Sequence, residues 1–323
     1  MMKTMNEFWQ KHKQGIILYG TMAFVFILIV ILATATQDGY PYNNLAIDTD
    51  IKVGNFEFDV AWYAVFILTG IMFGAALAYF EFKRFKIDTD ILFDGLLYTV
   101  PLAIIGARLW WVLFNLGSIH SFGDIFAIQD GGLAIHGAII VVFLFLIVFT
   151  KWKKISYWWM LDLVAPGFLI GQTLGRWGNF MNGELYGPAV DHLNFLPDFI
   201  SEQMYIGGSY HAPTFLYESL WNFTGLIVLL IIRRKKILKV GDAIGLYFMW
   251  YGLIRIPMEL LRFQGDPSDP LPLPWLDQVT AWYEMASLWT SVLLVLGGLS
   301  ILVFKRIFKK DLPYYNELAL GNK

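Results

Sequence analysis

Residues 157–187 read YWWMLDLVAPGFLIGQTLGRWGNFMNGELYG, so an apolar stretch runs directly into a polar, glycine-rich one. The hydrocarbon core of a bilayer needs about 20 mainly apolar residues per helix, and residues 157–175 meet that requirement. Seven further stretches meet it as well: 16–35, 60–80, 96–115, 133–150, 214–232, 243–261 and 286–304. This pattern predicts an all-α polytopic membrane protein with about eight transmembrane helices.

The composition excludes most other classes of protein. Of the 323 residues, 57 % are hydrophobic and 15 % are charged, whereas soluble chains carry about 25 % charged residues. A soluble globular protein, a disordered chain and a collagen-like fibre are therefore excluded. The net charge of −2 gives no indication of nucleic-acid binding. The absence of cysteine excludes disulfides, cysteine-ligated metal sites and a catalytic cysteine.

The lysines and arginines predict which side of the membrane each stretch faces. Nineteen of the 24 fall before the first apolar stretch or after the second, fourth, sixth and eighth, which all lie on one side. The positive-inside rule makes that side cytoplasmic and places both termini there. The first stretch ends in Ala33-Thr34-Ala35, as a signal peptide with a cleavage site would. A signal-peptide core has about 7–15 apolar residues, and the greater length here favours a retained helix.

Four arginines fall instead in the outer half of the predicted membrane or at its outer surface: Arg108, Arg176, Arg255 and Arg262. An arginine among lipid chains costs at least about 2.5–3.5 kcal/mol, so such a residue is expected to face a polar cavity or a partner. The guanidinium group suits bidentate phosphate binding. The four residues therefore suggest a site for an anionic phospholipid headgroup near the outer leaflet.

The same arginines also have a purely structural interpretation. Arg255, Glu259 and Arg262 are spaced four and three apart, on one helix face, where they could neutralise one another. Glu184 and Glu218 could do the same for the other two arginines.

Two further features concern packing and the outer surface. The longest outer segment, 176–213, is rich in Gly, Pro, Asn and aromatic residues and predicts a small extracytoplasmic cap. Small residues at four-residue spacing let two helices approach closely. We expect such contacts from the glycines that show this spacing, which are Gly70, Gly74, Gly167, Gly171 and Gly175.

The polar stretch 175–187 carries the most specific signal. Its sequence, GRWGNFMNGELYG, resembles at every fixed position the signature Gly-Arg-x-Gly-Asn-Phe-x-Asn-x-Glu-x-x-Gly of the prolipoprotein diacylglyceryl transferase family. The resemblance covers residues 60–305. Supporting matches follow in chain order: Trp62-Tyr63, Gly106-Ala107-Arg108, Asp130-Gly131-Gly132, His136-Gly137, His211-Ala212-Pro213, Tyr217-Glu218 and Tyr251-Gly252, with Arg255, Glu259 and Arg262 beyond them.

The resemblance implies an enzyme of the bacterial cytoplasmic membrane whose active site faces the outer leaflet. The family transfers the diacylglyceryl group of phosphatidylglycerol to the thiol of the lipobox cysteine in a preprolipoprotein signal sequence. A thioether forms and glycerol phosphate leaves. The implied organisation is a seven-helix core at 60–305, an extra N-terminal helix with its outer loop at 1–59, and a cytoplasmic tail at 306–323. Nothing in the sequence indicates a cofactor or a metal.

The resemblance also assigns expected roles to residues. Arg176 and Arg255 would stabilise the negative charge that builds on the departing phosphate. His136 is the candidate base for the acceptor thiol, because histidine titrates near neutrality; a neutral histidine that only packs helices is the alternative. Tyr63 would hydrogen-bond the headgroup at the catalytic centre. The expected substrate-binding residues are Arg108, Arg176, Asn179, Asn182, Glu184, Gly187, Tyr251, Glu259 and Arg262.

An anionic-lipid transporter or flippase is the alternative hypothesis, since it too would require outward-facing arginines. Such proteins also tend to show polar residues at the membrane midplane or broken helices in paired halves. The sequence shows neither pattern, so the transferase is the first hypothesis.

Overall fold

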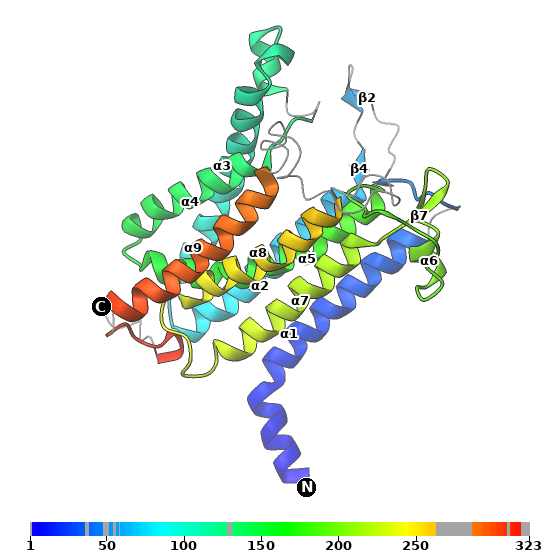
Figure 1. Cartoon of the computed structure of the whole chain (residues 1–323). Coiled ribbons are helices and arrows are strands. Elements are labelled where there is room, and N and C mark those ends of the chain that lie inside the picture. The colour runs from blue at the N-terminus through cyan, green and yellow to red at the C-terminus, as the bar shows by residue number, and fades with distance from the viewer. Residues whose placement is uncertain are drawn as a thin grey trace.

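The computed structural model describes residues 2–35, 39–47, 52–53, 56–57, 59–127, 131–262, 286–308 and 311–317. Within these ranges the chain is a bundle of long helices (Figure 1). Their bounds are α1 Met2–Ala35, α2 Trp62–Arg84, α3 Asp90–Phe114, α4 Ile135–Trp152, α5 Tyr157–Met181, α7 Thr214–Ile232, α8 Asp242–Arg262 and α9 Ala286–Phe308. Each of the eight apolar stretches thus corresponds to one long helix, as the sequence predicts.

The remaining described elements are short. The antiparallel strand pairs are β1 (Leu45–Ile47) with β4 (Val60–Ala61) and β2 (Lys52–Val53) with β3 (Phe56–Glu57). A three-stranded sheet has the order β5-β7-β6, from β5 (Ala189–Val190), β7 (Ser209–His211) and β6 (Tyr205–Ile206). The one-turn helix α6 (Asp198–Ser201) precedes β6.

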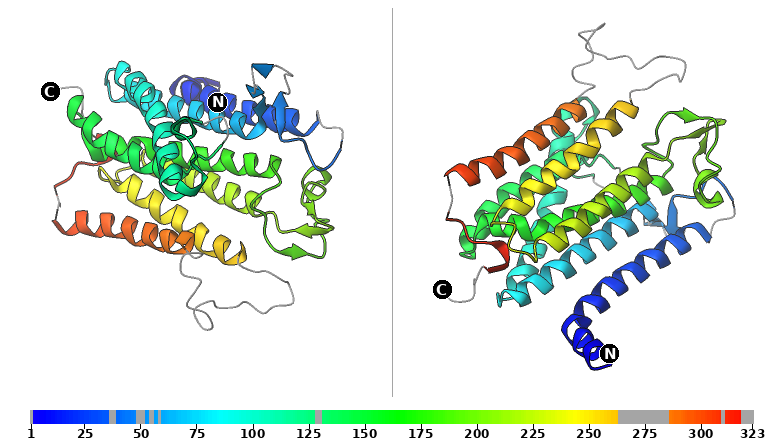
Figure 2. Two further views of the ribbon diagram at one scale, coloured as in Figure 1. Left: turned by 90° about the horizontal axis from the view of Figure 1, so that it is seen from above. Right: turned by 60° about the horizontal axis from the view of Figure 1, so that its bottom comes forward.

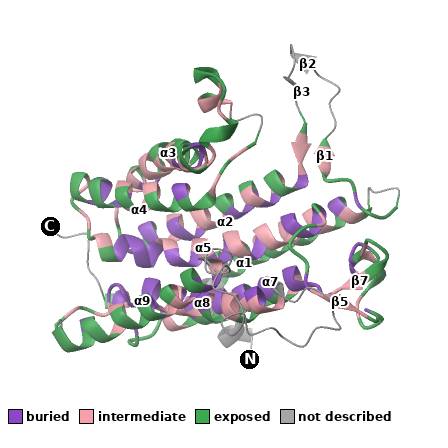
Figure 3. Ribbon diagram, turned by 45° about the horizontal axis from the view of Figure 1, so that its top comes forward, coloured by how far each residue is buried: buried purple, intermediate pink, exposed green. Residues whose placement is uncertain are grey.

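Six of the helices are long and apolar enough to cross a membrane: α1 from Lys13, α2, α3, α4, α7 and α9. The chain is therefore a multi-pass membrane protein. The helices α5 and α8 are also long, with 25 and 21 residues, but their polar residues lower their hydropathy. Most residues of α5 are buried against neighbouring helices (Figure 3). Polar side chains are tolerated there because they face protein instead of lipid.

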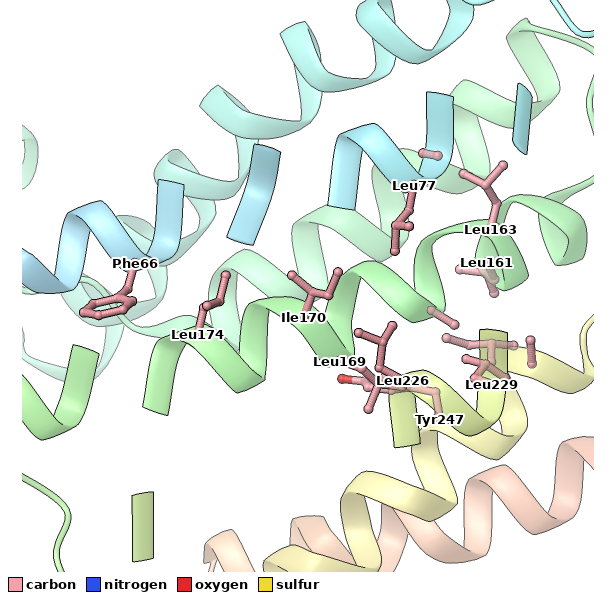
Figure 4. Packing of buried hydrophobic residues seen from close by; sticks show 14 of the residues in the cluster. Phe66, Leu77, Leu161, Leu163, Leu169, Ile170, Leu174, Leu226, Leu229 and Tyr247 are labelled. Atoms are coloured by element: carbon pink, nitrogen blue, oxygen red, sulfur yellow. The ribbon is translucent and has the colours of Figure 1, made fainter. Parts of the chain in front are cut away.

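The helix α5 packs most closely against α2. A Cβ added at Gly70 would lie 3.2 Å from the Gly171 Cα, and one at Gly74 would lie 3.3 Å from the Gly167 Cα. The predicted close approach at these glycines is confirmed. Beside the crossing, α2 residues such as Phe66 and α5 residues such as Leu174 form part of one buried hydrophobic cluster (Figure 4).

One end of the bundle gathers the basic residues around buried carboxylates. Glu81 on α2 is 1 % exposed and forms ion pairs with Arg84, Arg233 and Arg234. At the same end Asp242, the first residue of α8, forms ion pairs with Lys305 and Arg306 of α9. The C-terminal segment 311–317 also binds here, where the Tyr315 hydroxyl donates to Glu81 Oε2 at 3.1 Å. These contacts put three of the basic groups found in the sequence at one end of the bundle.

The opposite end carries the connection between α5 and α7. The strands β5, β6 and β7 and the helix α6 lie there, away from the C-terminus (Figure 1). The segment after α1 is fastened to this piece, because the Tyr42 N–H donates to Gln203 Oε1 at 2.7 Å and the Tyr42 hydroxyl donates to the Phe199 carbonyl at 3.2 Å. Burial raises the pKa of Tyr42, with the neighbouring Tyr40 adding to the shift.

The helix α1 runs along the outside of the bundle beside α2 (Figure 2). Much of its apolar surface is exposed, as in Phe24 and Ile27, which fits a lipid-facing helix. Its Phe26 ring packs edge-on against Trp177 of α5, with 5.5 Å between ring centroids. The extra N-terminal helix therefore touches the core close to the polar signature.

Candidate active site

A buried carboxylate joins arginines from two different helices at the end of the bundle that carries the short strands. Glu218 on α7 is fully buried. Its Oε2 lies 2.6 Å from Arg176 Nη2 on α5 and 3.3 Å from Arg255 Nη1 on α8. Both arginine side chains are 12 % exposed, so their guanidinium groups sit at the edge of the buried region. The structure brings together the two arginines predicted to be catalytic.

Arg255 has two further partners. Its Nη2 forms an ion pair with Glu259, one helical turn further along α8, and donates to the Ser287 Oγ of α9 at 3.1 Å. The expected neutralisation of Arg255 by Glu259 is therefore present. The carboxylates fix the orientation of the guanidinium, and each guanidinium has five N–H donors, so donors are left for a ligand.

The polar signature continues the network from Arg176. Arg176 Nη1 donates to Asn179 Oδ1 at 3.1 Å, and Asn179 Nδ2 donates to Glu184 Oε1 at 2.8 Å. Asn182 Nδ2 donates to the same Glu184 oxygen at 3.1 Å. These residues form one connected chain of hydrogen bonds, so the spacing in the signature places each partner within reach of the next.

The geometry of this chain depends on where α5 ends. The helix continues to Met181, six residues beyond the apolar stretch 157–175. Arg176 and Asn179 are therefore three apart on one helix face and can bond directly. The chain then reverses through Gly183 and Leu185, whose φ angles are +62° and +56°. This turn brings Glu184 back to Asn179.

Tyr63 lies next to the signature, at the first turn of α2. A Cβ added at Gly178 would lie 2.6 Å from the Tyr63 Cδ2, so the tyrosine ring rests on the space that this glycine leaves. Tyr251 of α8 is half-buried, and its ring stacks parallel to that of Tyr247 at 6.2 Å. Both tyrosines are thus on helices that border the arginine pair.

The glycine at the end of the signature packs tightly against the segment before α7. Gly187 is buried, and an added Cβ would lie 2.9 Å from the Ala212 Cβ and 3.0 Å from the Thr214 Cγ2. Its N–H donates to the Ala212 carbonyl at 2.9 Å. Its carbonyl oxygen lies 2.9 Å from His211 Nδ1. Gly187 therefore fastens the polar turn to the segment that begins α7.

Arg108 has other partners than the carboxylate cluster. Its side chain is buried near the C-terminal end of α3, and its guanidinium donates to the backbone carbonyls of Asp124, Ile125, Gly131 and Gly132 at 2.5–3.1 Å. Glu218, suggested from the sequence as a partner for Arg108, pairs with Arg255 and Arg176 instead. Arg108 holds the connection between α3 and α4 in place.

Hydrogen bonds within the segment 120–126, which follows α3, also stabilise it. Ser121 and Asp124 form a capping box on the short helix Phe122–Phe126. The Ser121 hydroxyl and the backbone N–H groups of His120 and Ser121 hold the pKa of the Asp124 carboxyl below its ordinary value. Arg108 donates to the backbone carbonyl of the same Asp124. Both the backbone and the side chain of Asp124 are therefore fixed by hydrogen bonds.

His136 lies on the first turn of α4 and is exposed. Its ring stacks over Trp110 of α3 with 6.5 Å between centroids. No hydrogen bond or ion pair connects His136 to the arginine cluster in the described part of the chain. The Arg262 side chain and Asp130 of the resemblance lie outside the described residues. Within the described ranges, no three His, Asp or Glu side chains gather as metal ligands would.

Sequence reasoning missed several uncharged residues of the site. Ser287 bonds Arg255, and Ser219 accepts the indole N–H of Trp177 at 3.1 Å. Gln172 and Asn222 lie one helical turn from Arg176 and Glu218, on the same helices. A search for polar residues of any kind at four-residue spacing from the arginines would have found the last two.

Comparison with known proteins bears on this site directly. The family model described as prolipoprotein diacylglyceryl transferase matches residues 51–304. The chain is 43 % identical over 258 residues to the phosphatidylglycerol–prolipoprotein diacylglyceryl transferase of Streptococcus pneumoniae strain JJA, covering 79 % of this chain and 93 % of that protein. The proteins of that name from strains Hungary19A-6 and ATCC 700669 show the same identity and coverage. The matched region contains every residue of the arginine cluster and begins after α1.

Proposed function

The chain belongs to the prolipoprotein diacylglyceryl transferase family, and from that premise we propose that it transfers the diacylglyceryl group of phosphatidylglycerol to a prolipoprotein. The acceptor is the thiol of the lipobox cysteine. The sulfur attacks the glycerol carbon that bears the phosphate, the carbon–oxygen bond breaks, and glycerol phosphate leaves with the electron pair. The product is a thioether.

The observation that carries this proposal is the pair of arginines held by Glu218. A phosphate ester leaves slowly unless its growing negative charge is stabilised by donors that are already in position. Arg176 and Arg255 supply such donors from two helices, and the ion pairs with Glu218 and Glu259 limit their movement. The lipid phosphate would bind to the remaining N–H groups of both arginines. Tyr251, one turn before Arg255, and Arg262, at the end of α8, would be further contacts.

The polar signature and Tyr63 would position the reacting groups. Asn179, Asn182 and Glu184 hold Arg176 through their hydrogen bonds, and Tyr63 offers its hydroxyl to the headgroup. A free thiol has a pKa of about 8.5, so modest assistance yields the thiolate. His136 is the proposed base, since it is exposed at the outer start of α4 and free to meet an acceptor arriving from outside. Arg108 and Gly187 would support this region through the loops they hold.

Two findings support placement in the bacterial cytoplasmic membrane: the relatives are bacterial, and the distribution of lysines and arginines supports one orientation of the helices. All eight long helices would span the bilayer, with the Glu81 and Asp242 clusters in the cytoplasm. The arginine site would then face the outer leaflet, beneath a small cap formed by the segment 182–213. The catalytic core would be residues 60–305, with α1 added before it and a short tail after it. The acceptor cysteine follows an apolar signal sequence and reaches the same outer face.

The test uses the purified chain, phosphatidylglycerol and a synthetic peptide with a lipobox cysteine. We expect the peptide mass to increase by one diacylglyceryl group and glycerol phosphate to appear in equal amount. Arg176→Ala and Arg255→Ala should abolish the reaction, while Arg84→Ala at the opposite end should retain it. Movement of the lipid between leaflets without any change in peptide mass would support the transporter instead and overturn the proposal.

A further inference from the structure

The polar region of the bundle extends below the arginine cluster. Gln172 precedes Arg176 by four residues on α5, and Asn222 follows Glu218 by four residues on α7. Because α5 and α7 run in opposite directions, both steps lead toward the basic end of the bundle. Four residues of helix rise about 6 Å. The two carboxamides therefore lie one turn deeper than the arginines, on helices that both face α8.

Asn222 is fully buried, and neither its Oδ1 nor its Nδ2 has a hydrogen-bond partner among the described residues. Gln172 donates from Nε2 to the Tyr247 hydroxyl at 2.8 Å, and its buried Oε1 has no partner in the part of the chain that the structure describes. The two amide atoms of glutamine can exchange places, with Oε1 accepting from the hydroxyl instead and Nε2 then free. Either way, two carboxamides present unused hydrogen-bonding groups in a buried layer, where such groups are rare.

The chain holds Asn222 in a fixed position. The neighbouring Trp221 donates its indole N–H to the Trp250 carbonyl at 2.9 Å, and Trp250 donates to the Trp221 carbonyl at 3.0 Å. Their rings stack at 4.6 Å between centroids. The position of the Trp250 ring requires glycine at residue 225, since a Cβ added there would lie 2.6 Å from the Trp250 Cδ1. The reciprocal bonds fix α7 against α8 at the depth of Asn222.

One turn below the carboxamides the buried side chains of the three helices are apolar, apart from the Tyr247 hydroxyl that Gln172 binds. Leu169 of α5, Leu226 of α7 and Tyr247 of α8 belong to the buried hydrophobic cluster (Figure 4). From the outer end inward, the interface of α5, α7 and α8 thus presents guanidinium groups, then carboxamides, then hydrocarbon. A phospholipid has the same order along its length: the phosphate, the two ester groups, and the acyl chains.

We propose that Asn222 and Gln172 bind the two ester carbonyl oxygens of the diacylglyceryl group. The inference rests on the proposed function and adds a requirement to it, because the enzyme would recognise the ester linkages as well as the phosphate. Each carboxamide N–H group donates to one carbonyl oxygen while the arginines hold the phosphate. These are positioning residues: they fix the glycerol carbon that the sulfur attacks.

The test compares two lipids that differ only in the groups the carboxamides would bind. Phosphatidylglycerol with ester-linked chains and phosphatidylglycerol with ether-linked chains of equal length are given separately to the full chain in mixed micelles with the lipobox peptide. Removing two hydrogen-bond acceptors should lower kcat/KM at least about fivefold. Equal use of both lipids by the unaltered chain would overturn the inference, and transfer from neither lipid would refute the proposed function itself.

Variants show whether the preference comes from these residues. Asn222→Leu and Gln172→Leu should each lower transfer from the ester lipid and leave transfer from the ether lipid nearly unchanged, so that the preference shrinks. Thr224→Val is the matched control, because Thr224 is exposed on the other side of α7 and its hydroxyl donates to the Leu220 carbonyl. The lipid preference of this variant should equal that of the unaltered chain. If Asn222 only holds a structural water, its variant will slow both lipids equally, and the inference fails.

Discussion

Glu218 determines where two guanidinium groups point, because it meets Arg176 and Arg255 with one carboxylate. A fixed planar guanidinium can offer two parallel N–H groups to a phosphate, whereas a lysine ammonium acts as a point charge. The chemistry at this position therefore depends on the shape of the cation as well as on its charge.

Arg176→Lys tests that dependence. We expect transfer to fall about 10²–10³-fold, the usual effect of losing one preorganised donor, although the positive charge is kept. The measurement is kcat/KM from the mass of the modified peptide. Arg84→Lys, at the opposite end of α2, is the matched control and should change the rate little. Near-normal transfer by Arg176→Lys would show that charge alone is sufficient.

His136→Asn tests the proposed base. We expect a loss of about 10²–10⁴-fold near neutral pH, the range for a general base. The loss should diminish as pH rises through the thiol pKa of about 8.5, because the acceptor then ionises without help. The measurement is the transfer rate of the variant and of the unaltered chain from neutral pH to above the thiol pKa. A deficit that stays constant with pH would assign His136 to helix packing through Trp110.

Some residues of this cluster could be predicted from the sequence, but most of their partners could not. Arg176, Asn179 and Glu184 could be predicted because their signature is contiguous and ionisable residues are rare in apolar stretches. The partners of Arg108 could not be predicted. They are backbone carbonyls, which every residue has, so no residue type in the sequence points to them. The link from Arg176 to Arg255 through Glu218 depends on how three distant helices pack.

At the scale of helices, the crossing of α2 and α5 fixes the site, because it sets where the last turns of α5 emerge. Gly70→Val would place side-chain atoms where the Gly171 backbone lies. Overpacking of this kind typically costs about 1–3 kcal/mol, so we expect a lower thermal midpoint in detergent and reduced transfer. Gly20→Val on α1 is the control, since no neighbouring atom of the described residues lies within 4 Å of a Cβ there. Equal midpoints for both variants would contradict the close crossing.

Helix ends show why hydropathy gives approximate bounds. The apolar stretch 157–175 predicts the start of α5 correctly, but the helix continues to Met181. Hydropathy falls at Arg176 because the last turns face other helices and polar partners instead of lipid. The fall in hydropathy at Arg176 therefore marks the point where α5 begins to face polar groups, and the helix itself continues.

At the scale of the molecule, the C-terminal segment closes the basic end through Tyr315. Burial raises the pKa of Tyr315, and the nearby Glu81 carboxylate adds to the shift. Folding therefore favours the protonated phenol. Its contribution to stability is complete below the ordinary phenol pKa of about 10 and is lost as pH rises above it.

Tyr315→Phe should remove this dependence. We expect the thermal midpoint of the unaltered chain to fall more steeply than that of Tyr315→Phe from about pH 9 to about pH 11. At neutral pH the variant should be less stable by about 0.5–1.5 kcal/mol, since the bond to Glu81 is lost. Tyr314→Phe, at the half-buried neighbouring residue, should follow the unaltered chain. Parallel curves for all three proteins would argue against this role of Tyr315.

The contacts of Glu81 have a consequence for how the protein is made. Its ion-pair partners Arg233 and Arg234 and its hydrogen-bond partner Tyr315, 234 residues further along, leave the ribosome long after α2 has been inserted. Until those residues are made, the Glu81 carboxylate is without most of the cations that neutralise it in the folded protein. Unfinished or truncated chains would therefore keep a poorly neutralised carboxylate at the basic end of the bundle.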